Sequence, residues 1–346
     1  MKKLKNSLYK LPFFSFMTIS ILLSSVKQSH AASAVDVLVQ MGLAKANALI
    51  VNTINGAVGL GSCQGNGQIS DVICNVMGAS SGLPGLVTAL AYLFGIILAV
   101  AALFKLKDHV LNPSQTPLSD SLKRFLAGGA LFTLPLITEA AQNALTGGNM
   151  DSSQVTVYNG QAANASGLDG MLVSLFADIY EPMINIIFAF GYLAGLILVV
   201  AGIGRIIKTA QDGPRGPAGM GTIMMFVIAG VLFSLSSIMG AFSSSMFQSS
   251  TVATFAVLET STGDTVIDQH VLAMISTVLV FMTIIGYISF MRGFFIIKDV
   301  AEGGGQASLM AGVTHIFGGA LAVNLGPLLN AVQSTLGLSD IGITFY

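Results

Sequence analysis

Long apolar runs alternate with short polar segments along most of this chain. Six runs are long enough to cross a bilayer, and they cover residues 83–104, 125–145, 182–204, 220–242, 271–297 and 309–332. A helix needs roughly 20 apolar residues to cross a hydrocarbon core of about 30 Å. Because lipid offers the backbone no hydrogen-bond partner, runs of this kind must be helical. The pattern predicts an all-α polytopic membrane protein with six transmembrane helices.

A shorter apolar stretch at the N-terminus has the form of an export signal. Four lysines precede about 13 apolar residues, and the small residues Ser29 and Ala31 offer a cleavage site. We expect a cleaved signal peptide over 1–31, with an uncleaved membrane anchor as the alternative. Residues 34–58 carry apolar side chains at helical spacing, which favours an amphipathic helix within the periplasmic segment 32–82.

The distribution of charge predicts the orientation. Basic residues gather in the turns within three pairs of apolar runs, and the segments between the pairs contain none. Lys and Arg are enriched in cytoplasmic loops, so we expect the turns to face the cytoplasm and both termini to be periplasmic, in a bacterial inner membrane. The basic turn residues are Lys105, Lys107, Lys123, Arg124, Arg205, Lys208, Arg215, Arg292 and Lys298.

The three pairs define the expected organisation of the chain. Each pair forms a helical hairpin, and polar periplasmic segments connect the hairpins. After the signal peptide and the segment 32–82 we expect a first hairpin over 83–145, a loop over 146–181, a second hairpin over 182–242, a loop over 243–270, a third hairpin over 271–332 and a tail over 333–346.

The hairpins also resemble one another in sequence. Tyr92, Tyr192 and Tyr287 stand near the start of each, and the return helices carry similar glycine-containing motifs at 128–132, 229–233 and 318–322. A tandem repeat explains this pattern. Chance similarity among apolar helices is the alternative.

Composition supports a membrane protein. Only 9% of the residues are charged, whereas a soluble domain usually carries about 25%. Of the 39 glycines, those early in the return helices would allow close packing of helices, either within the chain or between protomers. These glycines are Gly128, Gly129, Gly230, Gly318 and Gly319.

Candidate chemistry is sparse. The sequence contains no catalytic, metal-binding or phosphate-binding motif, so we expect no enzyme activity, no cofactor and no direct binding of nucleic acid. Glu139, His315 and Asn324 are polar residues within predicted spans, where a hydrogen bond between helices or an ion-coupling role would explain them. Cys63 and Cys74 form a candidate disulfide if their segment reaches an oxidising compartment, and two unlinked thiols are the alternative.

A family resemblance joins several of these motifs. The Tyr-Leu-x-Gly entry, the basic turn, the Gly-Gly-Ala-Leu return helix and the run Asn324-Leu325-Gly326-Pro327 resemble small inner-membrane components of type IVB (Dot/Icm-like) secretion systems. The resemblance is to IcmC/DotE-type proteins and their relatives IcmD/DotP and DotV, with counterparts in IncI-type conjugation systems. It covers roughly 83–335, and this chain is longer than those proteins.

The resemblance implies a structural or assembly subunit of an apparatus that exports effector proteins or conjugative DNA. Its partners would then be the lipid bilayer, other membrane subunits of the secretion system and possible further copies of itself. A small transporter or a channel-forming protein is the alternative, because repeated hairpins could line a path across the membrane.

Overall fold

A computed structural model describes residues 68–80, 82–115, 117–134, 136–138, 167–212, 219–248, 252–258, 263–304, 308–338 and 343–345. All of them belong to one compact unit, Ile50–Tyr346. The predicted signal peptide, the predicted amphipathic helix and the first part of the loop 146–181 lie outside these residues. The described residues are mostly helical, as the hydrophobic pattern predicted.

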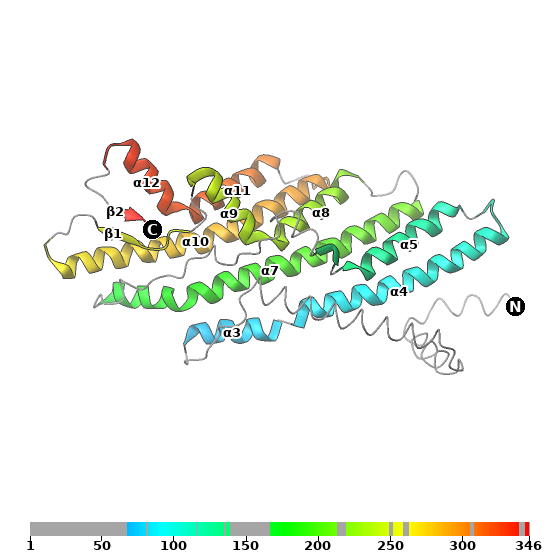
Figure 1. Cartoon of the computed structure of the whole chain (residues 1–346), viewed down its shortest axis with the longest axis horizontal. Coiled ribbons are helices and arrows are strands. Elements are labelled where there is room, and N and C mark those ends of the chain that lie inside the picture. The colour runs from blue at the N-terminus through cyan, green and yellow to red at the C-terminus, as the bar shows by residue number, and fades with distance from the viewer. Residues whose placement is uncertain are drawn as a thin grey trace. The chain divides into compact units, whose positions relative to one another are not determined.

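Three pairs of adjacent helices form the body of this unit. In each pair a long helix packs against a shorter helix that follows it in the chain (Figure 1). In the third pair, side chains cap the start of both helices. Asp264 accepts a hydrogen bond from the Val266 N–H, and Ser308 accepts one from the Ala311 N–H. The pairs are α4 (Gly82–Leu111) with α5 (Leu118–Phe132), α7 (Leu168–Asp212) with α8 (Met220–Phe233), and α10 (Thr265–Ala301) with α11 (Leu309–Val323).

The helices α7 and α10 form the centre of the unit. They pack against each other, and α7 also contacts α4, α5 and the short helix α3 (Ile69–Ser80). Leu196 of α7 and Tyr287 and Phe290 of α10 are fully buried. Since α7 has 45 residues, it is about 67 Å long, which exceeds the roughly 30 Å of a hydrocarbon core. Pro182 lies inside this continuous helix and does not begin it.

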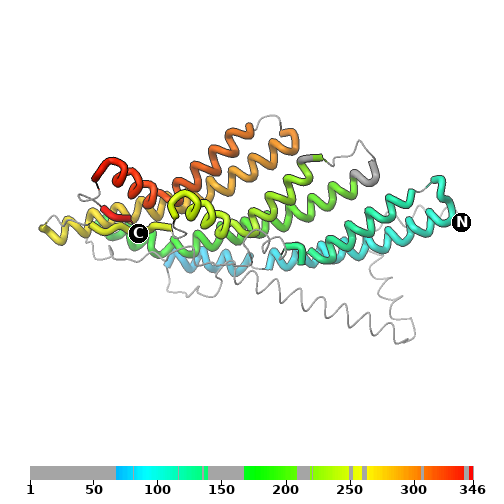
Figure 2. The backbone as a smooth tube through the Cα atoms, turned by 45° about the horizontal axis from the view of Figure 1, so that its top comes forward, coloured from blue at the N-terminus to red at the C-terminus, as the bar shows by residue number. Residues whose placement is uncertain are grey.

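Two return helices are sharply bent. The helix α8 meets α9 (Leu235–Phe247) at 83°, and α11 meets α12 (Leu325–Thr335) at 79° (Figure 2). The sequence predicted one transmembrane helix over each of 220–242 and 309–332, and each run instead contains two helices that meet at a bend. Apolar residues predominate on both sides of Ser234 and Asn324, so hydropathy does not mark either bend.

The number of membrane spans depends on whether each bent pair of helices is counted as one span. In the part of the chain that the structure describes, three helical segments are long and apolar enough to cross a membrane, namely Ile69–Leu111, Leu168–Lys208 and Thr265–Ala301. The number rises to five if each bent pair is one span. The predicted run 125–145 continues beyond the described residues, so six crossings remain a prediction.

A two-stranded antiparallel sheet joins segments that were expected to be periplasmic. Strand β1 (Ala256–Leu258) pairs with β2 (Ile343–Phe345) near the C-terminus. The Asn330 side chain of α12 holds β2 in place, donating a hydrogen bond to the Phe345 carbonyl oxygen (2.8 Å) and accepting one from the Phe345 N–H (3.0 Å). The all-α prediction omitted this small sheet.

Candidate functional site: glycine seams and helix breaks

The backbones of α10 and α11 touch along two pairs of glycines. A Cβ atom added to Gly319 would lie 2.7 Å from the Gly286 carbonyl oxygen, and one added to Gly286 would lie 2.8 Å from the Gly319 carbonyl oxygen. Seven residues nearer the turn, Gly293 and Gly312 face each other in the same way, at 2.8 and 3.2 Å. Only glycine allows such an approach, so we call these contacts the glycine seam.

The other two helix pairs have a corresponding contact. Gly95 of α4 and Gly128 of α5 face each other, and a Cβ atom on either would lie 2.8 Å from the carbonyl oxygen of the other. In the second pair, a Cβ atom on Gly195 would lie 3.0 Å from the Ala229 carbonyl oxygen. These three contacts allow the sequences of the three helix pairs to be aligned with one another, and we call this alignment the common register.

A polar residue ends each return helix at the same point of this register. Thr133, Ser234 and Asn324 follow the seam residue by five positions. Each donates a side-chain hydrogen bond to the carbonyl oxygen four residues earlier, at 2.9, 2.9 and 2.8 Å. At Gly230 the side chain takes the place of the backbone bond, because the Ser234 N–H turns to the Val231 carbonyl oxygen, whereas the Gly129 and Ala320 carbonyl oxygens also accept the backbone N–H of Thr133 and Asn324.

The break at Asn324 is also tied to α9. The Ser243 hydroxyl donates a hydrogen bond to the Asn324 Oδ1 atom at 2.7 Å, and both side chains are buried. Pro327 follows in α12 and has no N–H to continue the helix from α11. Asn324 therefore lies at the bend of one return helix and is hydrogen-bonded to the other.

The tyrosine pattern fits two of the three helix pairs. Tyr92 packs on Phe132 with ring centroids 5.1 Å apart, and Tyr192 packs on Phe233 at 5.3 Å. Both tyrosines precede their seam glycine by three residues, whereas Tyr287 follows Gly286 directly. Tyr287 packs instead against Phe188 of α7, at 5.2 Å, so its expected equivalence is wrong.

The predicted packing glycines have different surroundings. Gly128 and Gly319 lie in the helix contacts described above, and Gly230 is buried. Gly129 and Gly318 are exposed, and a Cβ atom at either would meet nothing within 4 Å.

The long-helix partners of these glycines, Gly286 and Gly293 among them, were not among the predicted packing glycines. Gly286 and Gly293, like Gly312 and Gly319, are seven residues apart, and this spacing was the available signal for their shared face.

The remaining polar candidates lie in separate places. His315 faces Ser289 of the adjacent helix, with 3.1 Å between the His315 Nδ1 and Ser289 Oγ atoms. Cys74 lies in α3 and is not free, while Cys63 is outside the described residues, so their pairing stays a prediction. Glu139 is also outside the described residues.

One ion pair joins the second and third helix pairs near their turns. Arg205 of α7 lies 3.0 Å from the Glu302 carboxylate, and Lys298 lies 3.3 Å from the same group and 2.9 Å from Asp299. In the first pair, Arg124 contacts Asp120 within α5 at 3.3 Å. Of the other basic turn residues, Arg215 is outside the described residues, Lys105 is half-buried, and Lys107, Lys123, Lys208 and Arg292 are exposed.

Polar contacts also occur at the other end of the long helices, where the acidic residues lie. His270 of α10 pairs with Asp169 of α7, and the Ser70 hydroxyl of α3 donates a hydrogen bond to Asp178 at 2.6 Å. These contacts fix α3 and α10 against the start of α7.

The described residues contain no cluster of three or more His, Cys, Asp or Glu side chains that could hold a metal ion. What the site offers chemically is close helix packing and hydrogen bonding within a membrane. No protein-family model matches the chain, and no curated protein or solved structure matches it either.

Proposed function

We propose that this chain is a structural or assembly subunit of the inner-membrane part of a type IVB secretion apparatus. Its three helix pairs would be tandem hairpin repeats with basic turns in the cytoplasm. The resemblance of residues 83–335 to IcmC/DotE-type proteins supports the choice of apparatus. The shared register of the three pairs supports the repeat.

One observation carries the structural role, namely the exposed face of α5 around Gly129. Gly129 and Thr133 are both exposed and four residues apart, which makes a small-xxx-small pair on the side turned away from α4. Leu126 and Leu136, each more than three-fifths exposed, border them. A helix of another subunit could approach this face as closely as α4 approaches Gly128.

The uneven burial of the long helices agrees with this role. Within the apolar part of α7, 56% of the residues are buried inside the chain, compared with 22% for the segment that includes α4. The first helix pair therefore leaves most of its apolar surface to lipid or to other proteins. The second and third pairs cover each other.

The test is assembly. We expect Gly129→Leu to abolish co-purification with other membrane components of the apparatus after gentle detergent extraction, with expression and thermal unfolding unchanged. Gly85→Leu is the matched control, because a Cβ atom at Gly85 also meets nothing within 4 Å but lies on α4. Retained co-purification of the Gly129 variant would contradict the proposed docking face.

The broken helices favour one second candidate, a transporter or channel. Transporters build substrate sites from discontinuous helices near the middle of the membrane. The helices α8 and α11 have 14 and 15 residues, about 21 and 22 Å, so helices that start at the cytoplasmic edge would break inside a core of about 30 Å. Solute flux through liposomes that contain the purified, monomeric chain would favour this candidate over the first.

A further inference from the structure

The first helix pair departs from the glycine seam at one level. Seven residues nearer the turn than Gly95 and Gly128, it has Ala102 and Ser121. In the register defined above, these positions correspond to Gly293 and Gly312 of the third pair. Two glycines that let α10 and α11 touch are thus replaced by residues with side chains.

This difference opens the first pair near its turn. In the second pair the Phe226 ring covers Gly202, where an added Cβ atom would lie 2.9 Å from it, and Ile316 covers Gly293 in the same way. Phe125 holds the corresponding position in α5, but its side chain is 54% exposed. A groove of about 340 Å³ lies between α4 and α5 at this level.

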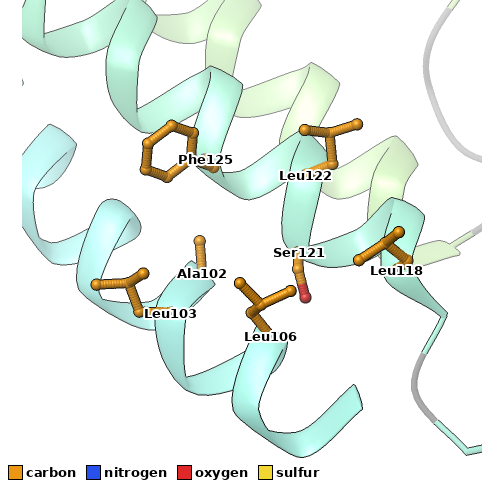
Figure 3. Close-up of a pocket in the computed structure, with 7 residues that line it drawn as sticks. All are labelled: Ala102, Leu103, Leu106, Leu118, Ser121, Leu122 and Phe125. Carbon is orange, nitrogen blue, oxygen red and sulfur yellow. The ribbon is translucent and has the colours of Figure 1, made fainter. Parts of the chain in front are cut away.

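Six apolar side chains and one hydroxyl line the groove. Figure 3 shows Ala102, Leu103 and Leu106 on α4 opposite Leu118, Ser121, Leu122 and Phe125 on α5. Ser121 is 5% exposed, and its Oγ atom is one of the buried side-chain atoms in the described structure without a hydrogen-bond partner. A buried hydroxyl without a partner is costly, so the groove suits a ligand that is apolar and carries an acceptor.

Cationic residues are close in sequence to the groove residues on both helices. Lys105 and Lys107 adjoin Leu106, while Lys123 and Arg124 lie between Leu122 and Phe125 in sequence. Four cations and two carboxylates, Asp108 and Asp120, occur over 102–125, and Asp120 pairs with Arg124. The segment 102–125 that contains the groove residues therefore has a net positive charge, which complements an anionic headgroup.

We propose that this groove binds an anionic phospholipid. One acyl chain lies between α4 and α5, the Ser121 hydroxyl donates a hydrogen bond to an ester carbonyl, and the flanking lysines attract the phosphate. The volume falls within the range of about 300–1,000 Å³ that is usual for small-molecule pockets. The proposal requires the turn to lie at a membrane surface, but it does not depend on which apparatus the chain belongs to.

Lipid selectivity can be measured at the groove itself. The chain contains no tryptophan, so Leu103→Trp gives a single fluorescent reporter at the groove in the purified full chain. In vesicles, we expect brominated phosphatidylglycerol to quench this reporter better than brominated phosphatidylcholine at equal mole fraction. The expected preference in binding constant is on the order of fivefold for each lysine engaged.

Two variants test whether the preference for anionic lipid arises from the groove or from the nearby cations alone. In the reporter background, Ala102→Gly with Ser121→Gly restores the glycines of the third pair, so α4 and α5 should close and the preference should disappear. The control Ala89→Gly with Ser119→Gly makes the same changes at exposed positions outside the groove and should keep the preference. If the closing variant fails to fold, Leu118→Glu adds a carboxylate at an exposed edge of the groove and should reverse the preference.

Three outcomes would overturn the proposal. Equal quenching by the two lipids in the reporter chain would show no selectivity for an anionic headgroup. An unchanged preference in the closing variant would assign selectivity to exposed cations alone. Shielding of the reporter from both lipids would place a protein segment, such as a second copy of this chain, in the groove. None of these outcomes depends on assembly through Gly129, which is tested separately.

Discussion

Replacing two adjacent glycines of α11 by alanine, one at a time, should have opposite effects on stability. A Cβ atom at Gly318 would meet nothing within 4 Å. A Cβ atom at Gly319 would lie 2.5 Å from the Phe290 backbone nitrogen and 2.7 Å from the Gly286 carbonyl oxygen. Both of these atoms belong to the backbone of α10, so a side-chain rotation cannot relieve the contact.

The magnitudes follow from two opposing effects. Alanine is more favourable than glycine inside a helix by about 0.8–1.0 kcal/mol, and this gain applies to both variants. Overpacking a tight contact costs about 1–3 kcal/mol, and this cost applies to Gly319→Ala alone. The two variants should therefore differ by about 1–3 kcal/mol in the free energy of unfolding, with Gly318→Ala the more stable.

The difference can be measured by thermal unfolding of the purified chain in one detergent, followed by circular dichroism. For a chain of 346 residues, each kcal/mol corresponds to roughly 1–2 °C in Tm. Because the two residues are neighbours in one helix, differences in expression, detergent binding and helix propensity largely cancel. Equal Tm values would refute the seam, and a higher Tm for Gly319→Ala would show that α10 and α11 do not touch there.

Three further predictions concern the polar contacts. Removing the buried hydrogen bond between α9 and the α11 break by Asn324→Leu should cost about 1–2 kcal/mol, and a double-mutant cycle with Ser243→Ala should show coupling of about 0.6 kcal/mol or more in the same unfolding assay. Glu302→Gln should weaken the pairing with Arg205, and because the Arg205 side chain is 33% exposed, the loss in Tm should shrink as salt is added. Asn330→Ala removes both hydrogen bonds to Phe345, so limited proteolysis should cleave the C-terminal strand faster.

The helical character of the chain could be predicted because it depends on local sequence. A run of apolar residues that is long enough to span a bilayer must form helix, whatever its neighbours are. The bends in the return helices depend on more. Asn324 is followed by Gly326 and Pro327, a signal that could have been used. Ser234 is followed only by two further serines, Ser236 and Ser237, and has no proline nearby.

The different surroundings of Gly318 and Gly319 could not be predicted from the sequence, for another reason. Gly318 and Gly319 have the same chemistry and the same neighbours in sequence, yet one is exposed and the other touches α10. Which of them faces the partner depends on the rotation of α11, and helices that are apolar on every side give no periodic signal for that rotation. The partner glycines on α10, seven residues apart, provide the missing information once the two helices are aligned.

Comparing equivalent residues of the three helix pairs distinguishes positions that serve packing from positions that are candidates for binding. Where the three helix pairs agree, as at Gly95, Gly195 and Gly286, the shared residue is explained by close packing within a pair, so a separate function is not needed. One level nearer the turn the pairs differ, because the return helices have Ser121, Thr222 and Gly312 there. Of the three long apolar segments, the one that includes α4 is the least buried. The groove lies at this level, between the two helices of the pair whose long helix is least buried, and that is why binding is tested there.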